Sequence, residues 1–283
     1  MDSETAEKLL ALNRAFYASF ARPFADSRPV RDPALTCILP YIPQRARVLD
    51  VGCGNGRLAL LLDRERPGVS YLGFDAVPEL VEVARARAAG LAAISAALRV
   101  ADVARPGWAR ALAGARAGTN GLEQSAPAPT PGAGARAGTR PAPTAGSGSS
   151  GGAVCPRFDC AVALAVLHHI PGFELRLRVL RDVAALLEPG GCLLLSTWQF
   201  LGSARMRRKI VDWAEVGLAA EALEPGDYLL DWKRGGRGLR YCHLVDEAEL
   251  DALADAGGFR VRETFRAGGR EGNLSLVAVL DRG

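Results

Sequence analysis

Hydrophobic and polar positions follow two rhythms along this chain, one typical of buried strands and one typical of amphipathic helices. Short apolar runs bounded by turn residues predict strands at residues 47–51, 70–74, 98–101, 159–165 and 192–197. Stretches with apolar residues three and four positions apart predict helices at residues 4–21, 58–64, 78–89 and 175–187. Because strands and helices alternate, we expect an α/β fold with a doubly wound, mostly parallel sheet in a single domain.

One long segment breaks this pattern. Residues 106–153 are mostly Ala, Gly, Pro, Ser and Thr, and the hexapeptide Gly-Ala-Arg-Ala-Gly-Thr occurs at 114–119 and again at 134–139. Such a composition buries too little apolar surface to offset its ordering entropy, so we predict a disordered internal loop. Strand-like runs flank the segment on both sides. We therefore expect a helical lead-in at 1–40 and one domain at 41–283 that the loop interrupts.

The overall composition favours a soluble, cytoplasmic protein. Of 283 residues, 49% are hydrophobic and 23% are charged, which is enough apolar material for a full core. The longest clean apolar run, 160–167, is far shorter than the ~18 residues of a membrane-spanning helix, and the acidic start shows no signal-peptide pattern. A net charge of +4 makes no strong case for a polyanionic partner. We expect no membrane partner and no DNA partner. We also expect no bound metal, because the six cysteines are scattered without a C-x-x-C pair.

A glycine-rich turn follows the first predicted strand. It reads Asp-Val-Gly-Cys-Gly-Asn-Gly at residues 50–56, and glycines there let the backbone turn sharply and approach a ligand at the start of a helix. The spacing G-x-G-x-G differs from the nicotinamide fingerprint G-x-G-x-x-G. It resembles motif I of the class I S-adenosylmethionine (SAM) methyltransferases, whose fold is Rossmann-like.

Two acids and a second turn fall where this resemblance places them. Asp75 ends the second predicted strand, where a carboxylate can accept from both ribose hydroxyls, and Asp102 ends the third, where it can accept from the adenine amino group. The Leu-Glu-Pro-Gly-Gly turn at 187–191 is also typical of that family. The resemblance therefore implies SAM as the cofactor and a site built from these motif positions and their neighbours. These positions are Tyr17, Asp50, Gly52, Cys53, Gly54, Gly56, Asp75, Ala76, Asp102, Val103 and Ala165.

The segment after the fourth predicted strand narrows the choice of methyl acceptor. It reads Ala-Val-Leu-His-His-Ile at 165–170 and lacks the [Asn/Asp/Ser]-Pro-Pro-Tyr tetrad of enzymes that methylate exocyclic amines. The order Cys155-Pro156, ahead of the strand, argues against the cysteine-nucleophile enzymes that act on pyrimidine C5. Consecutive side chains point apart, so we expect only one of His168 and His169 to face the site. The pair fits substrate contact and scaffolding of the cofactor pocket equally well.

The flanking segments resemble one family more specifically. Residues 17–28 are similar to the Tyr-x6-Phe-x3-Arg lead-in of the tRNA wobble-uridine carboxymethyl methyltransferases. Residues 239–244, Leu-Arg-Tyr-Cys-His-Leu, are similar to that family's Arg-Tyr-Tyr-His-Leu signature, with Cys242 in place of the second tyrosine. The resemblance implies esterification of the carboxylate of 5-carboxymethyluridine at the tRNA wobble position. It also implies two partners, the tRNA anticodon loop and a small zinc-binding activator subunit.

A carboxylate acceptor is already ionised at pH 7, so this chemistry needs a cation and hydrogen-bond donors, with no strong base. The candidates for that acceptor pocket are Arg28, His169, Arg240, Tyr241 and His243. A plain alternating strand is the other interpretation of residues 240–243, with Tyr241 and His243 on one face and Arg240 on the opposite face. A basic cluster fits anticodon phosphates and, equally, a solvent-exposed helix face. It consists of Arg205, Arg207, Arg208 and Lys209.

Two other functions stay open at this point. One is a small-molecule O- or C-methyltransferase of the quinone or natural-product type, which predicts an apolar lid over the site. Trp198, Phe200, Ile210 and Trp213 would supply that lid. The other is a non-catalytic SAM-fold protein that acts as an interaction module through residues 106–153. The intact glycine turn and the placed acids argue against this last function.

Overall fold

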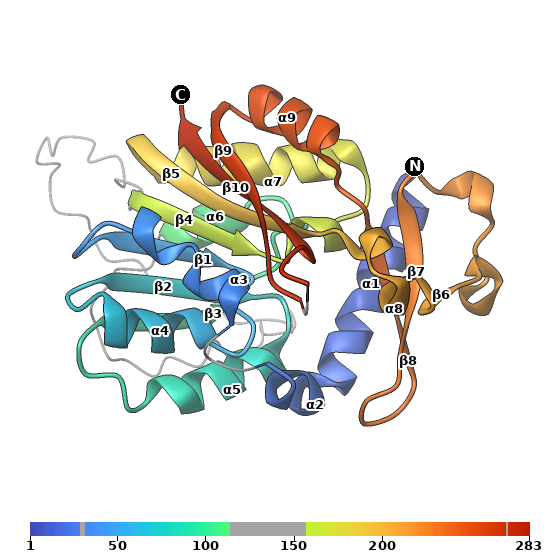
Figure 1. The fold of residues 1–283 in the computed structure, drawn as a ribbon, viewed down its shortest axis with the longest axis horizontal. Helices are drawn as coiled ribbons and strands as arrows, with labels where there is room; N and C mark the ends of the chain where they lie inside the picture. The colour runs from blue at the N-terminus through green and yellow to red at the C-terminus, as the bar shows by residue number, and fades with distance from the viewer. Residues whose placement is uncertain (29–31, 114–156, 270) are drawn as a thin grey trace, which may run out of the picture.

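A seven-stranded sheet forms the centre of the computed structural model, which describes residues 1–28, 32–113, 157–269 and 271–283 (Figure 1). The strand order is β3-β2-β1-β4-β5-β10-β9. The first five of these strands run parallel, and β10 and β9 are antiparallel to their neighbours. The strands are β1 (Arg47–Val51), β2 (Ser70–Asp75), β3 (Ser95–Val100), β4 (Phe158–Leu164), β5 (Leu187–Trp198), β9 (Phe259–Ala267) and β10 (Ser275–Arg282). The prediction of a doubly wound, mostly parallel sheet is confirmed.

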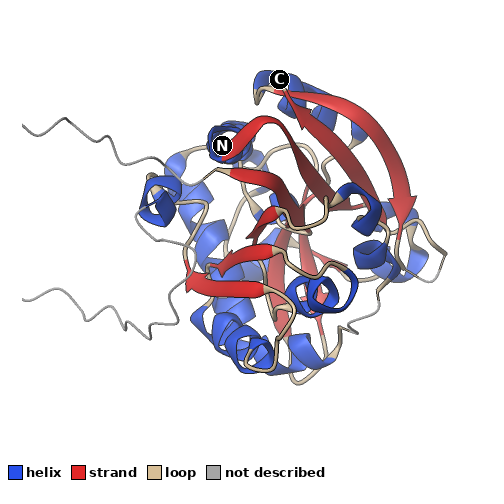
Figure 2. Cartoon of the chain, turned by 90° about the vertical axis from the view of Figure 1, so that its left-hand side faces the viewer, coloured by secondary structure: helices blue, strands red, loops and turns tan. Residues whose placement is uncertain are grey.

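Helices cover both faces of this sheet (Figure 2). They are α1 (Ser3–Ser19), α2 (Ala21–Asp26), α3 (Pro33–Thr36), α4 (Arg57–Glu65), α5 (Pro78–Ala88), α6 (Trp108–Ala113), α7 (Phe173–Leu186), α8 (Ala204–Arg207) and α9 (Glu247–Ala256). In the described ranges, no helix is both long and apolar enough to cross a membrane.

Alternation along β1 shows how one sequence run supplies both layers of the core. Leu49 and Val51 pack in the cluster that contains α6, α7 and α9, whereas Val48 packs in the cluster that contains α3 and α4. Each of these side chains is fully buried. A strand that is covered on both faces has apolar residues at successive positions. This run makes residues 47–51 recognisable as a strand from the sequence.

The order of the strands also predicts where a ligand binds. The chain winds outward from β1 through β2 to β3, then returns to the other side of β1 with β4 and β5. Ligands in open α/β sheets bind at this reversal, outside the carboxyl ends of the strands. The ends of β1, β2, β3 and β4 therefore define the candidate site.

A small antiparallel sheet lies beside this end of the main sheet, with α1 between the two (Figure 1). It consists of β6 (Ile210–Val211), β7 (Asp227–Trp232) and β8 (Gly238–His243). The buried side chain of Asn13 fixes α1 to β8: its amide nitrogen donates to Tyr241 O at 3.1 Å, and its amide oxygen accepts from Tyr241 N at 2.9 Å. Asn13 thus bonds to the strand as a neighbouring strand would, and α1 is held against β8.

The boundary predicted for the low-complexity segment was wrong at its start. Residues 108–113 form α6, and Trp108, only 4% exposed, lies 5.0 Å from Phe74 between ring centroids. Leu112 is buried in the same cluster. Burial of these two apolar side chains offsets the entropy cost of ordering about one and a half helical turns. The low-complexity composition around them gives no sign of this helix. The rest of the predicted loop, 114–153, lies outside the described residues.

Candidate cofactor and acceptor site

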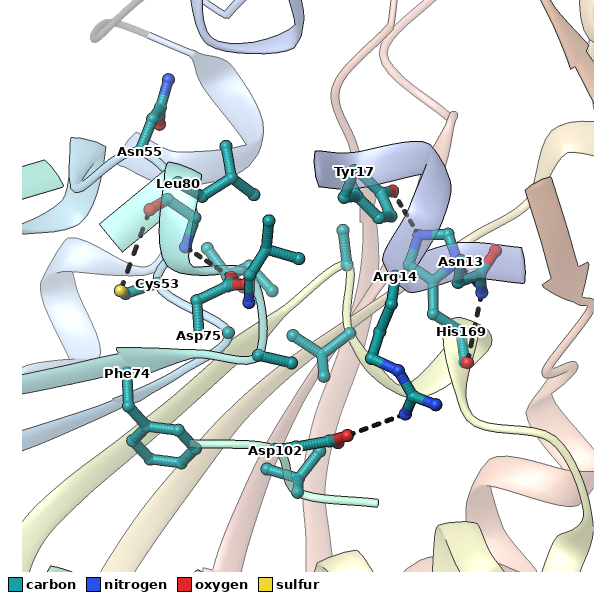
Figure 3. Close-up of a pocket in the computed structure, with 18 of the residues that line it drawn as sticks. Asn13, Arg14, Tyr17, Cys53, Asn55, Phe74, Asp75, Leu80, Asp102 and His169 are labelled. Atoms are coloured by element: carbon teal, nitrogen blue, oxygen red, sulfur yellow. Dashed lines mark hydrogen bonds and ion pairs between the residues drawn. The ribbon is translucent and has the colours of Figure 1, made fainter. Parts of the chain in front are cut away.

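One large cavity opens at the carboxyl ends of the parallel strands (Figure 3). Its empty volume is about 1080 Å³, including the solvent at its open mouth, and apolar side chains with a few charged groups line it, as is usual for small-molecule sites. Most of the predicted cofactor residues line it. They are Tyr17, Gly52, Cys53, Gly54, Asp75, Ala76, Asp102, Val103 and Ala165.

The glycine turn forms one wall of the cavity. Gly52 and Gly54 have φ values of 69° and 53°, in the left-handed region that favours glycine. A Cβ on Gly52 would also overlap the Cγ2 atom of Val166, so the turn passes directly against the segment after β4. Gly56, with φ 76°, is not among the residues that line the cavity and is the N-cap residue of α4. The prediction that Gly56 contacts the cofactor is therefore corrected: it caps the helix.

Asp75 lies at the end of β2 with both carboxylate oxygens aimed at backbone groups. One oxygen accepts from Gly54 N and the other from Val77 N, each at 3.0 Å. These bonds fix the carboxylate beside the glycine turn with lone pairs still available to hydroxyl donors. Burial raises the pKa of Asp75 to about 6.

This raised pKa predicts a pH dependence of cofactor affinity. Ribose hydroxyls donate hydrogen bonds to a carboxylate, so a ligand bound there favours the ionised form. As the pH falls below about 6, Asp75 takes up a proton, and we expect the affinity for SAM to drop by about tenfold per pH unit. Calorimetric titration with SAM between pH 5 and pH 7 measures this. An affinity that stays constant over that range contradicts the role given to Asp75.

Asp102 is already partnered in this structure. Its carboxylate accepts from Ala104 N at 2.9 Å and from the Arg14 guanidinium of α1 at 3.0 Å. Arg14 also lines the cavity, so the pair spans from the end of β3 to the N-terminal helix (Figure 3). A ligand amino group at Asp102 therefore lies next to Arg14 or replaces it. The sequence analysis missed Arg14, because nothing in its own segment indicates that α1 crosses the end of β3.

Asp50 does not line the cavity, which corrects the prediction that it binds the cofactor. It is 5% exposed and accepts a hydrogen bond from the Tyr71 hydroxyl at 2.6 Å. Burial raises the pKa of Asp50 to about 7. The residue supports the glycine turn from behind, on the face of β1 that packs toward α4.

His169 and Tyr17 form the wall opposite the glycine turn (Figure 3). His169 Nδ1 lies 3.0 Å from Tyr241 O, and its Nε2 lies 2.7 Å from the Tyr17 hydroxyl. A carbonyl only accepts, so the proton of the neutral ring is on Nδ1, and Nε2 accepts the proton of Tyr17. Burial, with the nearby charge of Arg240, lowers the pKa of His169 to about 3. The imidazole is therefore neutral at pH 7 and has no free nitrogen to act as a base.

His168 points away from the cavity, so His169 is the histidine that faces the site. The His168 ring is fully buried, stacks on Trp198 at 5.0 Å, and accepts from Trp198 N at 3.3 Å. Trp198 itself lines the cavity, whereas Phe200, Ile210 and Trp213 do not. Of the apolar lid expected for a small-molecule enzyme, only the tryptophan at the end of β5 is in place.

Two arginines lie at the same end of the cavity without a carboxylate partner among the described residues. Arg28 lines the cavity, 4.8 Å from the ring of Phe24 and 5.6 Å from that of Trp198. Burial lowers its pKa to about 10, so it stays protonated at pH 7. Arg240 is only 2% exposed and lies just behind the wall, with Nη1 3.4 Å from the Tyr17 hydroxyl and with Nε unbonded.

Aromatic rings surround the Arg240 guanidinium. Its central carbon lies 4.5 Å from the ring of Trp198, 5.3 Å from that of Phe16 and 5.5 Å from that of Trp232. Cation–π attraction of about 1–2 kcal/mol per ring offsets part of the several kcal/mol that burying an unpaired cation costs. The charge of Arg240 therefore acts on the cavity through Tyr17 and Trp198, which corrects the prediction that it contacts the acceptor.

Tyr241 and His243 lie outside the cavity, and this part of the predicted acceptor pocket was wrong. Their side chains extend from the face of β8 opposite Arg240, as the alternating-strand interpretation predicts. The Tyr241 hydroxyl donates to Asp227 at 2.8 Å, and His243 bonds to Asp227 and to Glu249, each at 2.7 Å. Both ring nitrogens of His243 face carboxylates, so this histidine is an imidazolium that ties β7 to α9.

The two carboxylates raise the pKa of His243 against the opposing effect of burial. A raised histidine pKa contributes stability that is complete below the unfolded value of about 6.5 and is lost as the pH rises through the folded value. We expect His243→Gln to cost about 3 kcal/mol of unfolding free energy at pH 6 and clearly less at pH 9. Urea denaturation of both proteins at the two pH values measures this. An equal cost at pH 6 and pH 9 would show that His243 is uncharged in the folded protein.

Asn13 is a second residue that the sequence analysis missed. A signal was present, because Asn13 falls among the apolar positions of the first helix, between Leu9 and Phe16 at helical spacing. A polar residue in a buried stripe needs a hydrogen-bonding partner. Its partner, the backbone of β8, is 228 residues away in sequence and could not be identified from the helix alone.

Comparison with known proteins agrees with this geometry. A profile of the methyltransferase domain family matches residues 22–264. The chain belongs to that family. The match covers the glycine turn, both strand-end acids and β8, so the cofactor wall and the segment that carries Arg240 fall within one methyltransferase domain.

One named relative and two solved structures are similar to this chain. A protein of Encephalitozoon cuniculi named as a methyltransferase is 33% identical over 125 residues, which is 44% of this chain and 53% of that protein. The match thus spans about half the length of that relative. A SAM-dependent methyltransferase from Methanosarcina mazei has a TM-score of 0.56 and 21% identity, over 87% of this chain and 96% of that one. The CcbJ methyltransferase from Streptomyces caelestis has a TM-score of 0.57 and 16% identity, over 95% and 98%.

These structural likenesses show the fold, and the cavity of this domain fits SAM, its cofactor. The glycine turn leaves space where a Cβ would overlap Val166, and Asp75 presents a fixed carboxylate beside it. Asp102 follows the end of the neighbouring strand, β3, and lines the same cavity. When bound, SAM supplies an electrophilic methyl group on a sulfonium.

Proposed function

We propose that this methyltransferase esterifies a carboxylate, and that its acceptor is the carboxymethyl group of 5-carboxymethyluridine at the tRNA wobble position. The observation that carries the proposal is the composition of the acceptor end of the cavity. That end holds the cation Arg28, with Arg240 directly behind it, and its one imidazole has both nitrogens engaged.

A site with cations and no free base favours an acceptor that is already ionised. Methyl transfer from a sulfonium is an in-line displacement, which an enzyme accelerates chiefly by alignment and by excluding water. A hydroxyl or ammonium acceptor must lose a proton, and His169 cannot take one. A carboxylate needs only orientation, which a guanidinium fork provides.

The presence of two arginines also matches the presence of two carboxylates. One belongs to the proposed acceptor, and the other belongs to the methionine part of SAM. Arg28 is the group that reaches into the cavity, and Arg240 contributes charge from behind Tyr17. Calorimetry separates the two anions: Arg28→Gln weakens SAM binding if Arg28 holds the cofactor carboxylate, and weakens only acceptor binding if it holds the acceptor. In both cases an anion at this end of the cavity is supported, and unchanged binding of both ligands overturns it.

A basic surface next to Arg240 favours a polyanionic carrier for the acceptor. The Lys209 ammonium lies 5.7 Å from the ring of Trp232, and the central carbon of the Arg240 guanidinium lies 5.5 Å from the same ring. Arg205 and Lys233 are near enough to lower the pKa of Lys209, after burial and Arg240. Cations thus continue from the cavity to the exposed edge of the small sheet, where phosphates of an anticodon loop can be bound.

The assay compares two acceptor pools. Total tRNA treated with mild alkali, which converts wobble methyl esters to free carboxylates, and a metabolite extract are each incubated with the protein and methyl-labelled SAM. We expect label in the tRNA pool, with a zinc-binding activator protein added in a parallel reaction because the family resemblance implies one. Label in the metabolite pool alone supports a small-molecule methyltransferase instead, and label in neither pool with the activator present overturns the proposal.

A further inference from the structure

Trp198, the last residue of β5, contacts both of the arginines that lie at the acceptor end of the cavity. The central carbon of the Arg240 guanidinium is 4.5 Å from the centre of the Trp198 ring, and that of Arg28 is 5.6 Å away. Both distances are within the ~6 Å over which a cation–π attraction acts. The indole is 6% exposed and lines the cavity together with Arg28. One aromatic ring therefore stands where buried arginines usually have a carboxylate.

The difference between a ring and a carboxylate decides what the two arginines can bind. A carboxylate neutralises a guanidinium and occupies its N–H donors, whereas an indole attracts the cation through its face and leaves the charge and the donors available to a ligand. Burial lowers the pKa of Arg28, and the nearby charges of Arg57 and Arg240 lower it further. These cations repel each other. A bound anion relieves the repulsion, and a neutral ligand does not.

His168 holds the indole from the side away from the cavity. Its ring is fully buried and stacks on that of Trp198, with the ring centroids 5.0 Å apart and an interplanar angle of 27°. Its Nδ1 accepts from Trp198 N at 3.3 Å, so the proton of the neutral ring is on Nε2. Burial lowers the pKa of His168 well below its usual value, and nearby cations, Arg240 among them, lower it further. The imidazole therefore adds no third cation to the indole.

The second nitrogen of His168 shows why a histidine is needed at this position. Nε2 is buried and has no hydrogen-bond partner among the described residues. Buried donors are seldom left unpaired, and a phenylalanine here would stack on the indole without an unpaired donor. The group that phenylalanine would lack is Nδ1, which fixes the end of β5 and with it the indole.

We propose that Trp198 is a specificity-determining residue for anionic acceptors, and that His168 is a positioning residue that acts through it. Trp198 holds Arg28 and Arg240 at the acceptor end of the cavity and leaves their charge unneutralised. His168 fixes the indole by one hydrogen bond and one ring contact, although it does not reach the cavity itself. The inference rests on the carboxylate acceptor proposed above and names the side chain that selects the anion.

The first test measures methyl transfer to saponified tRNA. Trp198→Leu keeps an apolar side chain but removes the π face, and we expect it to raise KM for the tRNA about thirtyfold while kcat changes less than about threefold. Trp198→Phe keeps a π face and should raise KM less than about fivefold. Equal effects of the two substitutions would overturn the proposal and make Trp198 an apolar lid residue.

Two variants of His168 separate its hydrogen bond from its ring. His168→Ala should raise KM about tenfold, and His168→Asn should recover most of this loss, because its Oδ1 can accept at the place of Nδ1. Calorimetry with 5′-methylthioadenosine, which has the adenine and ribose of SAM but neither its carboxylate nor its charge, reports whether the cofactor end stays folded. Its dissociation constant should be the same in every variant. No recovery in His168→Asn, or weaker binding of this ligand in step with KM, would overturn the function given to His168.

A second test needs no tRNA and so separates this inference from the proposed function. Acetate is a minimal carboxylate, and its methyl NMR signal broadens when it exchanges with a protein site. We expect the wild type and Trp198→Phe to broaden the signal, and Trp198→Leu and Arg28→Gln to broaden it less. Trp213→Leu is the matched control and should behave as the wild type, because Trp213 does not line the cavity. Equal broadening by all variants overturns the inference, whereas the expected pattern without methylation of tRNA overturns the proposed function alone.

Discussion

Replacing Gly52 with alanine should weaken SAM binding at least 100-fold, about 3 kcal/mol. Two costs combine at this position. The backbone has φ 69°, which an L residue adopts at a cost of about 1–2 kcal/mol, and the new Cβ would overlap Val166 Cγ2. Valine is stiff about χ1, so the turn must move away from the segment after β4. That movement displaces the backbone that faces the cofactor.

A matched pair of variants separates the two costs. Gly190 has a similar φ of 77° with open space around it, and it lies outside the cavity lining. Gly190→Ala should therefore destabilise the fold by about 1–2 kcal/mol and leave the affinity for SAM unchanged. The double variant Gly52→Ala/Val166→Ala removes the overlap and should regain part of the affinity. If Gly52→Ala binds SAM as the wild type does, the glycine turn is not the cofactor wall.

Arg240→Met should lower kcat/KM for a carboxylate acceptor about 100-fold, roughly 2.7 kcal/mol, while changing the free energy of unfolding by less than about 1 kcal/mol. The reason is that aromatic rings surround this buried cation in the folded protein, and no carboxylate among the described residues pairs with it. Burial and the cation–π contacts nearly cancel in stability. The contribution of Arg240 to the positive potential at the acceptor end of the cavity is lost in full, whereas that of Arg28 remains.

Arg176 is the control for this prediction. It is equally buried, at 1% exposed, but it is bonded to Glu224 and Glu249, each at 2.8 Å. Arg176→Met leaves two carboxylates without their cation and should cost about 3–5 kcal/mol of stability. Urea denaturation measures both variants. A comparable loss in Arg240→Met would mean that Arg240 is a structural residue, and an unchanged kcat/KM would remove it from the acceptor site.

Local periodicity was sufficient to predict the five parallel strands of the main sheet and its cofactor wall, but β9 and β10 were not predicted. The apolar run at 47–51 and the glycines after it specify a strand, a turn and a helix within ten residues, and Asp75 follows its own strand directly. Each of these features depends on neighbours in sequence. The position at which the ends of β1 and β2 meet then follows from the parallel order of the strands.

The acceptor side was harder to predict because it depends on docking between distant segments. Tyr241 and His243 share a motif with Arg240, but the pleat of β8 turns them toward Asp227 and away from the cavity. Asp50 was misplaced for the same reason, since alternate residues of β1 face opposite layers. The contributions of Asn13 and Arg14 arise only when α1 lies across β8 and the end of β3.

The central claim is that the chain transfers the methyl group of SAM to a carboxylate, and the stability of the product bond tests it most directly. A methyl ester releases its methyl group as methanol in mild alkali, whereas methyl groups on nitrogen, carbon or an ether oxygen stay bound. After reaction of saponified tRNA with methyl-labelled SAM, nearly all transferred label should become volatile on alkaline treatment. Label that remains on the acceptor after the same treatment would contradict the assignment of a carboxylate acceptor.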